Sequence, residues 1–239
     1  MNETIPAALA AAVRRDPTMP LLTWYDDASG DRTELSGATI DNWVAKTANL
    51  LVDGAGLSPG DPVAVLLPPH WQTAAILLGA WAGGLTAHVG GRPQPVDVLF
   101  ASPAGVAAAA EWNAGDRYAT GLLPLAMPLR ELPPGYADYT IEVRGYGDRF
   151  APYQPVGADD PALAGVSHRD LTGTAAARAQ ELGITPGARV LIDAGKHPDP
   201  VDWLLAPLVA GASIVLCANL DPQAVEKRVA SENVTLTLA

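Results

Sequence analysis

The sequence predicts an α/β protein with two pseudo-symmetric subdomains, each a mainly parallel sheet with flanking helices. Apolar segments of strand length and helix length alternate along most of the chain, and one such unit occurs twice. Alternation of this kind is typical of parallel sheets, because two parallel strands need a crossover connection that usually contains a helix. The 23 Gly and 22 Pro among 239 residues suit a turn-rich α/β protein and disfavour a helical bundle.

The internal repeat is the more specific observation. Shifted by 127 positions, residues 56–89 align without gaps on residues 183–216. The identical pairs are Gly56/Gly183, Pro59/Pro186, Gly60/Gly187, Val63/Val190, His70/His197, Leu77/Leu204, Leu78/Leu205 and Gly84/Gly211. Such a period is too long for a solenoid, so it predicts two equivalent α/β halves. Each half has a helix that ends near a Pro-Gly turn, then a strand, a second helix and a second strand.

The elements of the first half follow from apolar spacing and turn residues. Residues 1–15 predict a short amphipathic helix, and the apolar residues after Ser36 recur at helical spacing until Gly54 and Gly56. Strands are expected at 62–67, 85–89, 96–101 and 117–122, and helices at 70–83 and 103–113. The segment 138–150 is a further candidate strand.

The second half repeats this order. A helix over 167–182 ends at Gly183, a strand covers 188–193, a helix over 199–210 ends at Gly211, and a strand covers 212–217. Asp221 is expected to cap a helix that has Pro222 at its first position, and a β-branched strand begins at Val234. Because the prolines between 152 and 161 mark a loose stretch, we place the subdomains at 1–150 and 151–239.

Charge and composition exclude several classes of function. With 26 acidic and 15 basic residues, the chain has a net charge of -11 and no basic cluster for a phosphate backbone, so no nucleic-acid partner is expected. Cys217 is the only cysteine, and residues 1–15 lack the basic start of a signal peptide. Residues 63–91 carry no formal charge, but prolines at 68 and 69 interrupt them. A cytoplasmic protein without a membrane span is therefore predicted.

The repeated segments resemble a known superfamily. The stretch from Trp43 through Gly91, with GLSPGDPVAVLLPPHWQTAAILLGAWAGG at 56–84, is similar to the N-terminal region of the adenylate-forming (AMP-binding) enzymes: acyl-CoA synthetases, peptide-synthetase adenylation domains and luciferases. The segment 158–171, ADDPALAGVSHRDL, resembles the flanks of their phosphate loop, and 204–216 and 221–239 resemble the elements that follow it. The layout also resembles a short actinobacterial family of AMP-binding-enzyme-like proteins.

The resemblance implies a loop that this sequence lacks. The family pattern [S/T]-G-[S/T]-T-G-x-P-K-G supplies hydroxyls, backbone N–H groups and a lysine to the triphosphate of ATP. Here Asp160 is followed by PALAGV and then directly by Ser167. The chain also ends before the regions that match the family's adenine and Mg²⁺ sites and its C-terminal domain, and none of its three lysines matches a family lysine.

These differences predict a truncated, degenerate relative without catalytic activity, a pseudoenzyme that binds a small ligand or has a regulatory role. ATP, AMP or an acyl-adenylate is the ligand class that the resemblance implies, and no metal site is expected. Two alternatives remain. In the first, the chain is an interaction protein whose uncovered face binds a second copy of the chain or a partner protein. In the second, it has acyl-adenylate or acyl-CoA ligase activity that depends on a partner.

Four groups of residues are candidate ligand contacts. His197 lies near a family position beside the acyl pocket, and the alternative role is that of a helix-start turn residue mirrored by His70. Ser167 and His168 begin a helix, where capping is the alternative role. Gly90, Gly91 and Arg92 follow a strand at its carboxyl end, a common anion site. Glu142, Arg144 and Asp148 belong to the densest charged cluster. On a strand, Asp138, Glu142 and Arg144 would share one face and form a polar site, although a solvated edge strand is the alternative.

Overall fold

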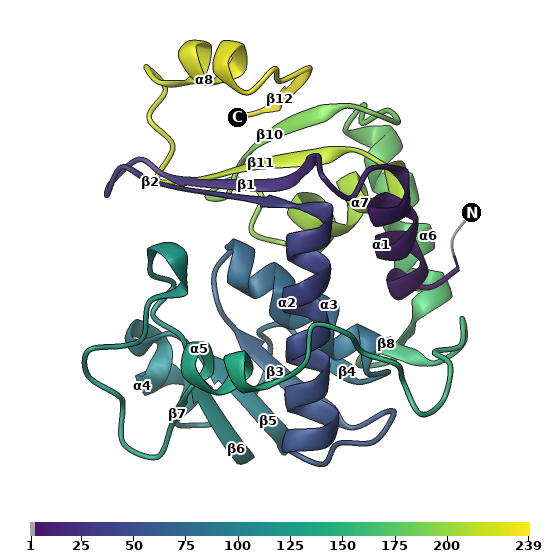
Figure 1. Ribbon diagram of the computed structural model, residues 1–239, viewed down its shortest axis with the longest axis vertical. Helices are drawn as coiled ribbons and strands as arrows, with labels where there is room; N and C mark the ends of the chain where they lie inside the picture. The colour runs from purple at the N-terminus through teal and green to yellow at the C-terminus, as the bar shows by residue number, and fades with distance from the viewer. Residues whose placement is uncertain (1–2) are drawn as a thin grey trace. The chain divides into compact units, whose positions relative to one another are not determined.

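The computed structural model describes residues 3–239 and has the predicted α/β fold, with two mainly parallel sheets flanked by helices (Figure 1). The five-stranded sheet has the order β12-β10-β11-β1-β2, and the seven-stranded sheet has the order β7-β6-β5-β3-β4-β8-β9. Among the strand pairs of the described residues, only β1/β2 and β8/β9 are antiparallel.

The strands are β1 Pro20–Asp26, β2 Asp31–Ser36, β3 Pro62–Leu66, β4 Thr86–His88, β5 Val96–Ala101, β6 Ala114–Ala119, β7 Ala137–Asp138, β8 Pro161–Leu163, β9 Val166–Ser167, β10 Arg189–Asp193, β11 Ser213–Ala218 and β12 Leu236–Leu238. The α-helices are α1 Ile5–Arg15, α2 Gly37–Asn49, α3 Trp71–Ala82, α4 Val106–Ala109, α5 Tyr139–Glu142, α6 His168–Glu181, α7 Ala206–Ala210 and α8 Val225–Ser231. Short 3₁₀ turns occur at η2 Pro103–Gly105, η3 Pro124–Ala126 and η4 Val143–Gly145, and single π-helical turns at η1 Leu50–Gly54 and η5 Val201–Leu205.

The chain divides into two compact units. The first comprises residues up to Asp41, Pro69–Ala74 and Arg169–Ala239, and the second comprises Asn42–Pro68 and Ala75–His168. This division does not coincide with the boundary that we placed at residue 150. The reason is that β1 pairs in parallel with β11, so the N-terminal hairpin completes the sheet of the C-terminal part. A pairing across nearly the whole chain leaves no local pattern in the sequence.

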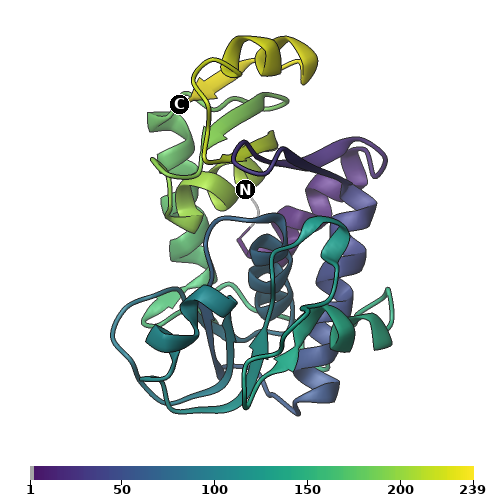
Figure 2. The same ribbon diagram turned by 90° about the vertical axis from the view of Figure 1, so that its left-hand side faces the viewer.

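The first unit buries both faces of its sheet. Figure 1 shows α8 on one face of β10 and β11, with α1, α6 and α7 on the other, and α8 keeps its place in the turned view of Figure 2. On the α8 face, Leu191, Val215 and Cys217 form a buried cluster with Val229 of α8. Alternate residues such as Val190 and Ile214 face the other side, as strand geometry requires.

In the second unit, side chains also pack on both faces of the seven-stranded sheet. Trp112 and Ala109, at the end of α4, pack on Leu99 and Ala64 on one face of the seven-stranded sheet. On the other face the Phe100 ring meets the rings of Tyr118 and Tyr139 at 5.4 and 5.6 Å. Tyr139 also shares a buried hydrogen bond of 2.7 Å with Thr47 of α2, which ties α2 to this face.

The internal repeat is confirmed at the level of single hydrogen bonds. The repeated glycine pairs all have positive φ: 74° and 70° at Gly56 and Gly183, 93° and 78° at Gly60 and Gly187, and 74° at both Gly84 and Gly211. The Gly60 N–H donates to the Gly84 carbonyl at 2.8 Å, and the Gly187 N–H donates to the Gly211 carbonyl at 3.0 Å. Strand register repeats too, since Pro62 pairs with Thr86 and Arg189 pairs with Ser213. The glycines are therefore identical because only glycine adopts these conformations without strain.

Several predicted elements need correction. The segment 138–150 is not a strand: it forms α5 and η4. The predicted helix at 103–113 is reduced to η2 and α4, and the strand at 117–122 begins and ends three residues earlier, as β6. Helix α8 begins at Val225 and not at Pro222, because the Asp221 carboxylate accepts the Gln223 N–H at 2.9 Å and closes a turn before the helix.

The uncharged segment 63–91 folds as strand, helix and strand, as predicted. In the described part of the chain, no helix is both long and apolar enough to cross a membrane.

A network of charged side chains lies on the five-stranded sheet. The Glu232 carboxylate accepts hydrogen bonds from the Tyr25 hydroxyl at 2.5 Å, from Arg32 Nη2 at 2.9 Å and from Arg189 Nη2 at 2.5 Å. Glu232 is only 7% exposed. Burial alone would raise the pKa of this carboxyl, but the hydrogen bonds from Tyr25, Arg189 and Arg32 outweigh burial and lower the pKa to about 2.

This low pKa predicts a loss of stability in acid. Glu232 has its ordinary pKa of 4.5 in the unfolded chain, so its contribution is complete above that pH and disappears as the pH falls through the folded pKa of about 2. The expected loss is about 2 kcal/mol of unfolding free energy, because the partly exposed Arg32 weakens the interaction. Urea unfolding at pH 6, 4 and 3 measures it, and equal stability at pH 6 and pH 3 would contradict the assignment.

Candidate functional site

The carboxyl ends of four parallel strands meet at one edge of the five-stranded sheet. These strands are β1, β10, β11 and β12. Open α/β sheets bind ligands at this edge, because the loops and helix starts that follow the strands converge there. The loop after β10 carries His197, which the sequence singled out.

His197 belongs to a three-residue cluster at this edge. Its Nδ1 lies 3.1 Å from Asp202 Oδ2, and Arg178 of α6 donates to the same carboxylate through Nε at 2.7 Å and Nη2 at 3.1 Å. These hydrogen bonds, from Arg178 first and also from His197, lower the pKa of Asp202 against the opposing effect of burial. Asp202 therefore stays ionised and holds both side chains in place.

The cluster leaves one ring nitrogen available. A carboxylate only accepts hydrogen bonds, so the Nδ1 of a neutral His197 carries the proton and Nε2 keeps its lone pair. Within residues 3–239, Nε2 makes no hydrogen bond. A histidine oriented in this way by an aspartate can accept a hydrogen bond from a ligand, or donate one when it is protonated.

The loop that carries His197 is ordered by its own aspartates. Asp193 accepts the Gly195 N–H on its carboxylate at 2.9 Å and the His197 N–H on its backbone carbonyl at 3.0 Å. Asp199 accepts the Val201 N–H at 2.8 Å at the start of η5. The position of His197 is therefore set before any ligand binds, which lowers the entropic cost of binding.

The two histidines of the repeat have different roles. His70 is buried, its Nδ1 accepts the Gln72 N–H at 3.1 Å, and burial lowers its pKa to about 3. His70 is therefore the helix-start residue that we considered as the alternative for both. The side chain of His197 is partly exposed and pairs with the Asp202 carboxylate. Although His197 occupies the same position in the repeat as His70, it does not have the buried structural role of His70.

Ser167 and His168 lie directly after the point where the family pattern places its phosphate loop. They follow a short hairpin in which Pro161 pairs with Ser167 and Leu163 pairs with Val166, so Ala164 and Gly165 form a two-residue turn. Gly165 has a φ of 74°, as such a turn requires. His168 is buried, and burial lowers its pKa to about 4 against the opposing effect of Asp160. A buried, neutral imidazole beside a tight hairpin is poorly placed to meet a phosphate.

Gly90, Gly91 and Arg92 are exposed and follow β4, at the carboxyl edge of the seven-stranded sheet. Both glycines have positive φ, at 67° and 90°. The loop is closed by a hydrogen bond of 2.7 Å between His88 Nδ1 and Gln94 Nε2. The role of Gly90, Gly91 and Arg92 as an anion site stays a prediction.

Glu142, Arg144 and Asp148 do not share one face. The expected strand is helical, and residues two apart on a helix point to different sides. Arg144 Nη2 donates to the Ala126 carbonyl at 2.7 Å, and Asp148 pairs with Lys46 at 2.9 Å. Arg144 and Asp148 therefore contact different parts of the chain and do not form one site with each other.

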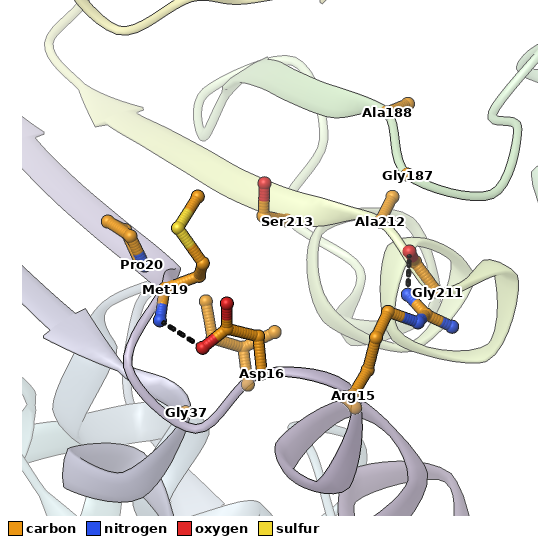
Figure 3. A pocket seen from close by; sticks show the side chains of 12 residues that line it. Arg15, Asp16, Met19, Pro20, Gly37, Gly187, Ala188, Gly211, Ala212 and Ser213 are labelled. Atoms are coloured by element: carbon orange, nitrogen blue, oxygen red, sulfur yellow. Dashed lines mark hydrogen bonds between the residues drawn. The ribbon is translucent and has the colours of Figure 1, made fainter.

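The opposite edge of the five-stranded sheet has a pocket that the sequence did not reveal. Its volume is about 200 Å³, and it lies where α1 ends, beside the amino ends of β10 and β11 (Figure 3). Figure 3 shows Arg15 donating to the Gly211 carbonyl, at 2.6 Å, and Asp16 accepting from the Met19 N–H, at 3.3 Å. Arg15 and Asp16 already bond to the chain itself. We therefore interpret this pocket as a packing contact between segments that are far apart in the sequence, and not as a ligand site.

No signal in the sequence links His197 to its partners, since Arg178 precedes Asp202 by 24 residues and lies on another helix. Among residues 3–239 there is no group of three or more His, Cys, Asp or Glu side chains arranged to hold a metal ion.

Comparison with solved structures identifies the fold. The fatty acyl CoA synthetase of Mycobacterium tuberculosis matches with a TM-score of 0.73 and 15% identity, over 98% of this chain and 49% of that one. The acetoacetyl-CoA synthetase from Streptomyces lividans matches with a TM-score of 0.73 and 19% identity, over 98% and 42%. Apo MatB from Rhodopseudomonas palustris matches with a TM-score of 0.70 and 18% identity, over 99% and 49%. The chain spans about half the length of these proteins.

Comparison of sequences gives a nearer relative. No family model matches the chain. A protein of Mycobacterium tuberculosis (strain ATCC 25618 / H37Rv), described as a TIGR03089 family protein, is 43% identical over 247 residues, which cover 98% of this chain and 100% of the relative. The chain therefore belongs to the TIGR03089 family, with the fold of the N-terminal part of the adenylate-forming superfamily.

Proposed function

We propose that this protein is a non-catalytic, small-ligand-binding form of the adenylate-forming fold. The observation that carries this proposal is the β8–β9 hairpin. Where the superfamily pattern places a loop for the ATP triphosphate, residues 161–167 form a hairpin of two short paired strands joined by a two-residue turn. Transfer to the α-phosphorus needs neutralised charge and a positioned leaving group, and this hairpin offers no lysine for either task.

The proposed ligand site is the carboxyl edge of the five-stranded sheet, with His197 as its polar contact. Asp202 and Arg178 orient the His197 ring, and the preordered loop after β10 fixes its backbone. Several solved relatives are named acyl-CoA synthetases, and one is described as ATP-bound MatB. Their names favour an adenine nucleotide or an acyl-adenylate as the ligand class. Because the hairpin replaces the triphosphate loop, we expect AMP or an acyl-adenylate, and we expect the triphosphate of ATP to add nothing to the affinity.

Calorimetry with AMP, ATP and a non-hydrolysable acyl-adenylate analogue tests this proposal. We expect the analogue to bind with a Kd of about 1–100 µM, and ATP to bind no more tightly than AMP. His197→Ala is expected to weaken binding at least ~10-fold, because it removes the oriented hydrogen bond. Glu111→Gln is the control, since Glu111 is an exposed residue of the second unit and belongs to none of the candidate sites, and it should leave the Kd unchanged.

Activity assays complete the test. Carboxylate-dependent exchange of pyrophosphate into ATP is expected to be absent with the purified protein. Measurable exchange would overturn the non-catalytic assignment, and failure of all three ligands to bind would overturn the ligand class.

A further inference from the structure

Another pocket lies in the second unit, beside the chain that leads into β3 and β4. Its volume is about 330 Å³, which is within the range of small-molecule sites. The chain between η1 and β3 forms one wall, with Val52, Leu57 and Pro59, and Gly83 lines the pocket where α3 ends. The segment 150–154, which contains no helix or strand, forms the other wall. All of these residues belong to one unit, so the pocket is complete within it.

The second wall is tethered to the helix that precedes the first wall. The Asn49 side-chain amide, at the end of α2, donates to the backbone carbonyls of Gly147 and Arg149 at 3.0 Å each. Four residues after Asn49, the carboxylate of Asp53 accepts the Tyr153 hydroxyl on Oδ1 at 3.0 Å. These contacts fix the two walls relative to each other. The pocket is therefore formed before any ligand binds, which lowers the entropic cost of binding.

Two aromatic side chains line the pocket. Phe150 is half-buried, whereas Tyr153 is 83% exposed. The hydrogen bond to Asp53 raises the pKa of Tyr153 above its usual value, so at neutral pH the hydroxyl keeps its proton and stays bonded. An aromatic ring offers apolar contact area and a face of negative potential, to which both apolar groups and cations bind.

The charged groups that contact the pocket walls are negative. Among residues 3–239, no charged side chain lines the pocket itself, and Arg149 is close in sequence but is not part of the lining. Two charged side chains hydrogen-bond to lining residues, and both are carboxylates: Asp53 bonds to the Tyr153 hydroxyl, and Asp61 accepts the Ser58 N–H at 2.8 Å. The whole chain carries a net charge of -11, which attracts cations and repels anions.

We propose that this pocket binds a small organic cation, an ammonium group carried on an apolar body. The apolar body lies between the two walls, and the ammonium group lies against the Tyr153 ring on the side of Asp53. Attraction to the ring and attraction to the carboxylate then act on the same positive charge. An anion of the same size would instead meet two carboxylates and no basic side chain of the lining. His197 lies in the other unit, so this site and the proposed nucleotide site can be tested separately.

Three ligands of similar size and shape test the sign of the charge. They are phenethylammonium, phenethyl alcohol and hydrocinnamate, which are cationic, neutral and anionic, each titrated into the isotope-labelled full chain and followed by the NMR shifts of backbone amides. We expect the ammonium to bind with a Kd of about 0.1–1 mM, the alcohol at least ~5-fold more weakly, and the carboxylate more weakly still. The largest shifts are expected at Gly56, Ser58, Gly83 and Gln154.

The same titrations can overturn the proposal in three ways. These are the absence of saturable binding of the ammonium, a Kd that is the same for all three ligands, and largest shifts that fall outside the pocket.

Variants separate the charge of the site from its shape. The amide oxygen of Asp53→Asn can still accept the Tyr153 hydroxyl, so we expect the same unfolding midpoint and the same Kd for the alcohol, but at least a ~3-fold higher Kd for the ammonium. Tyr153→Ala removes the ring and should weaken binding of both ligands. Glu226→Gln is the control, because it removes one negative charge from an exposed position of α8 in the other unit. An Asp53→Asn variant that binds the ammonium as tightly as the wild type, or a Glu226→Gln variant that is weakened equally, would contradict the proposal.

Discussion

Replacing Glu232 by glutamine is expected to lower the free energy of unfolding by about 3 kcal/mol. The carboxylate accepts hydrogen bonds from Tyr25, Arg32 and Arg189, and it is the acidic partner of both arginines in the network. Arg189 is largely buried, so the neutral amide leaves a desolvated guanidinium without its counter-charge. The loss is larger than for a surface ion pair, because water cannot replace the carboxylate at Arg189.

Glu34→Gln is the matched control for this prediction. Glu34 also pairs with Arg32, at 2.5 Å, but both side chains are more than a third exposed. Its loss should cost less than about 0.5 kcal/mol. Urea unfolding followed by tryptophan fluorescence compares the two variants, since Trp24 and Trp203 lie in the same unit as Glu232. Equal effects of the two substitutions would show that burial of the network contributes nothing.

The parts of the fold that repeat locally could be predicted from the sequence. The offset of 127 located both Pro-Gly turns, and the glycines identical in the two halves have positive φ in the structure. Apolar runs located β3, β5, β10 and β11, because each is buried on both faces and needs few polar residues. These features depend on neighbours in sequence, which is why spacing was enough to find them.

The parts that depend on distant contacts could not be predicted. The segment 138–150 carries alternating charge and aromatic residues, which favoured a strand, but the buried Asp138 carboxylate caps the Thr140 N–H and starts a helical turn instead. His197 was recognised as a candidate, whereas Asp202 and Arg178, which orient it, were not. Side chains on separate helices meet only through packing, and the sequence gives no measure of that.

Replacing Gly79 by alanine is expected to destabilise the second unit by about 3 kcal/mol, although alanine is the better helix former. Gly79 lies where α3 crosses α2, and a β-carbon there would lie 2.6 Å from Thr47 Cβ and 3.2 Å from the Val44 carbonyl oxygen. Neither neighbour can move easily, since the Thr47 hydroxyl bonds to the Trp43 carbonyl at 2.8 Å and to the Tyr139 hydroxyl at 2.7 Å. The two helices must therefore separate, and the buried contacts on both sides loosen.

The opposite sign is expected for the same substitution at Gly173. This glycine lies within α6, and a β-carbon there meets no atom within 4 Å. Gly173→Ala should raise the free energy of unfolding by about 0.5–1 kcal/mol, because alanine loses less backbone entropy on folding. Thermal unfolding of the two variants beside the wild type distinguishes close helix packing from helix propensity. If both substitutions shift the midpoint upward, then α2 and α3 do not pack at the distance that requires glycine at position 79.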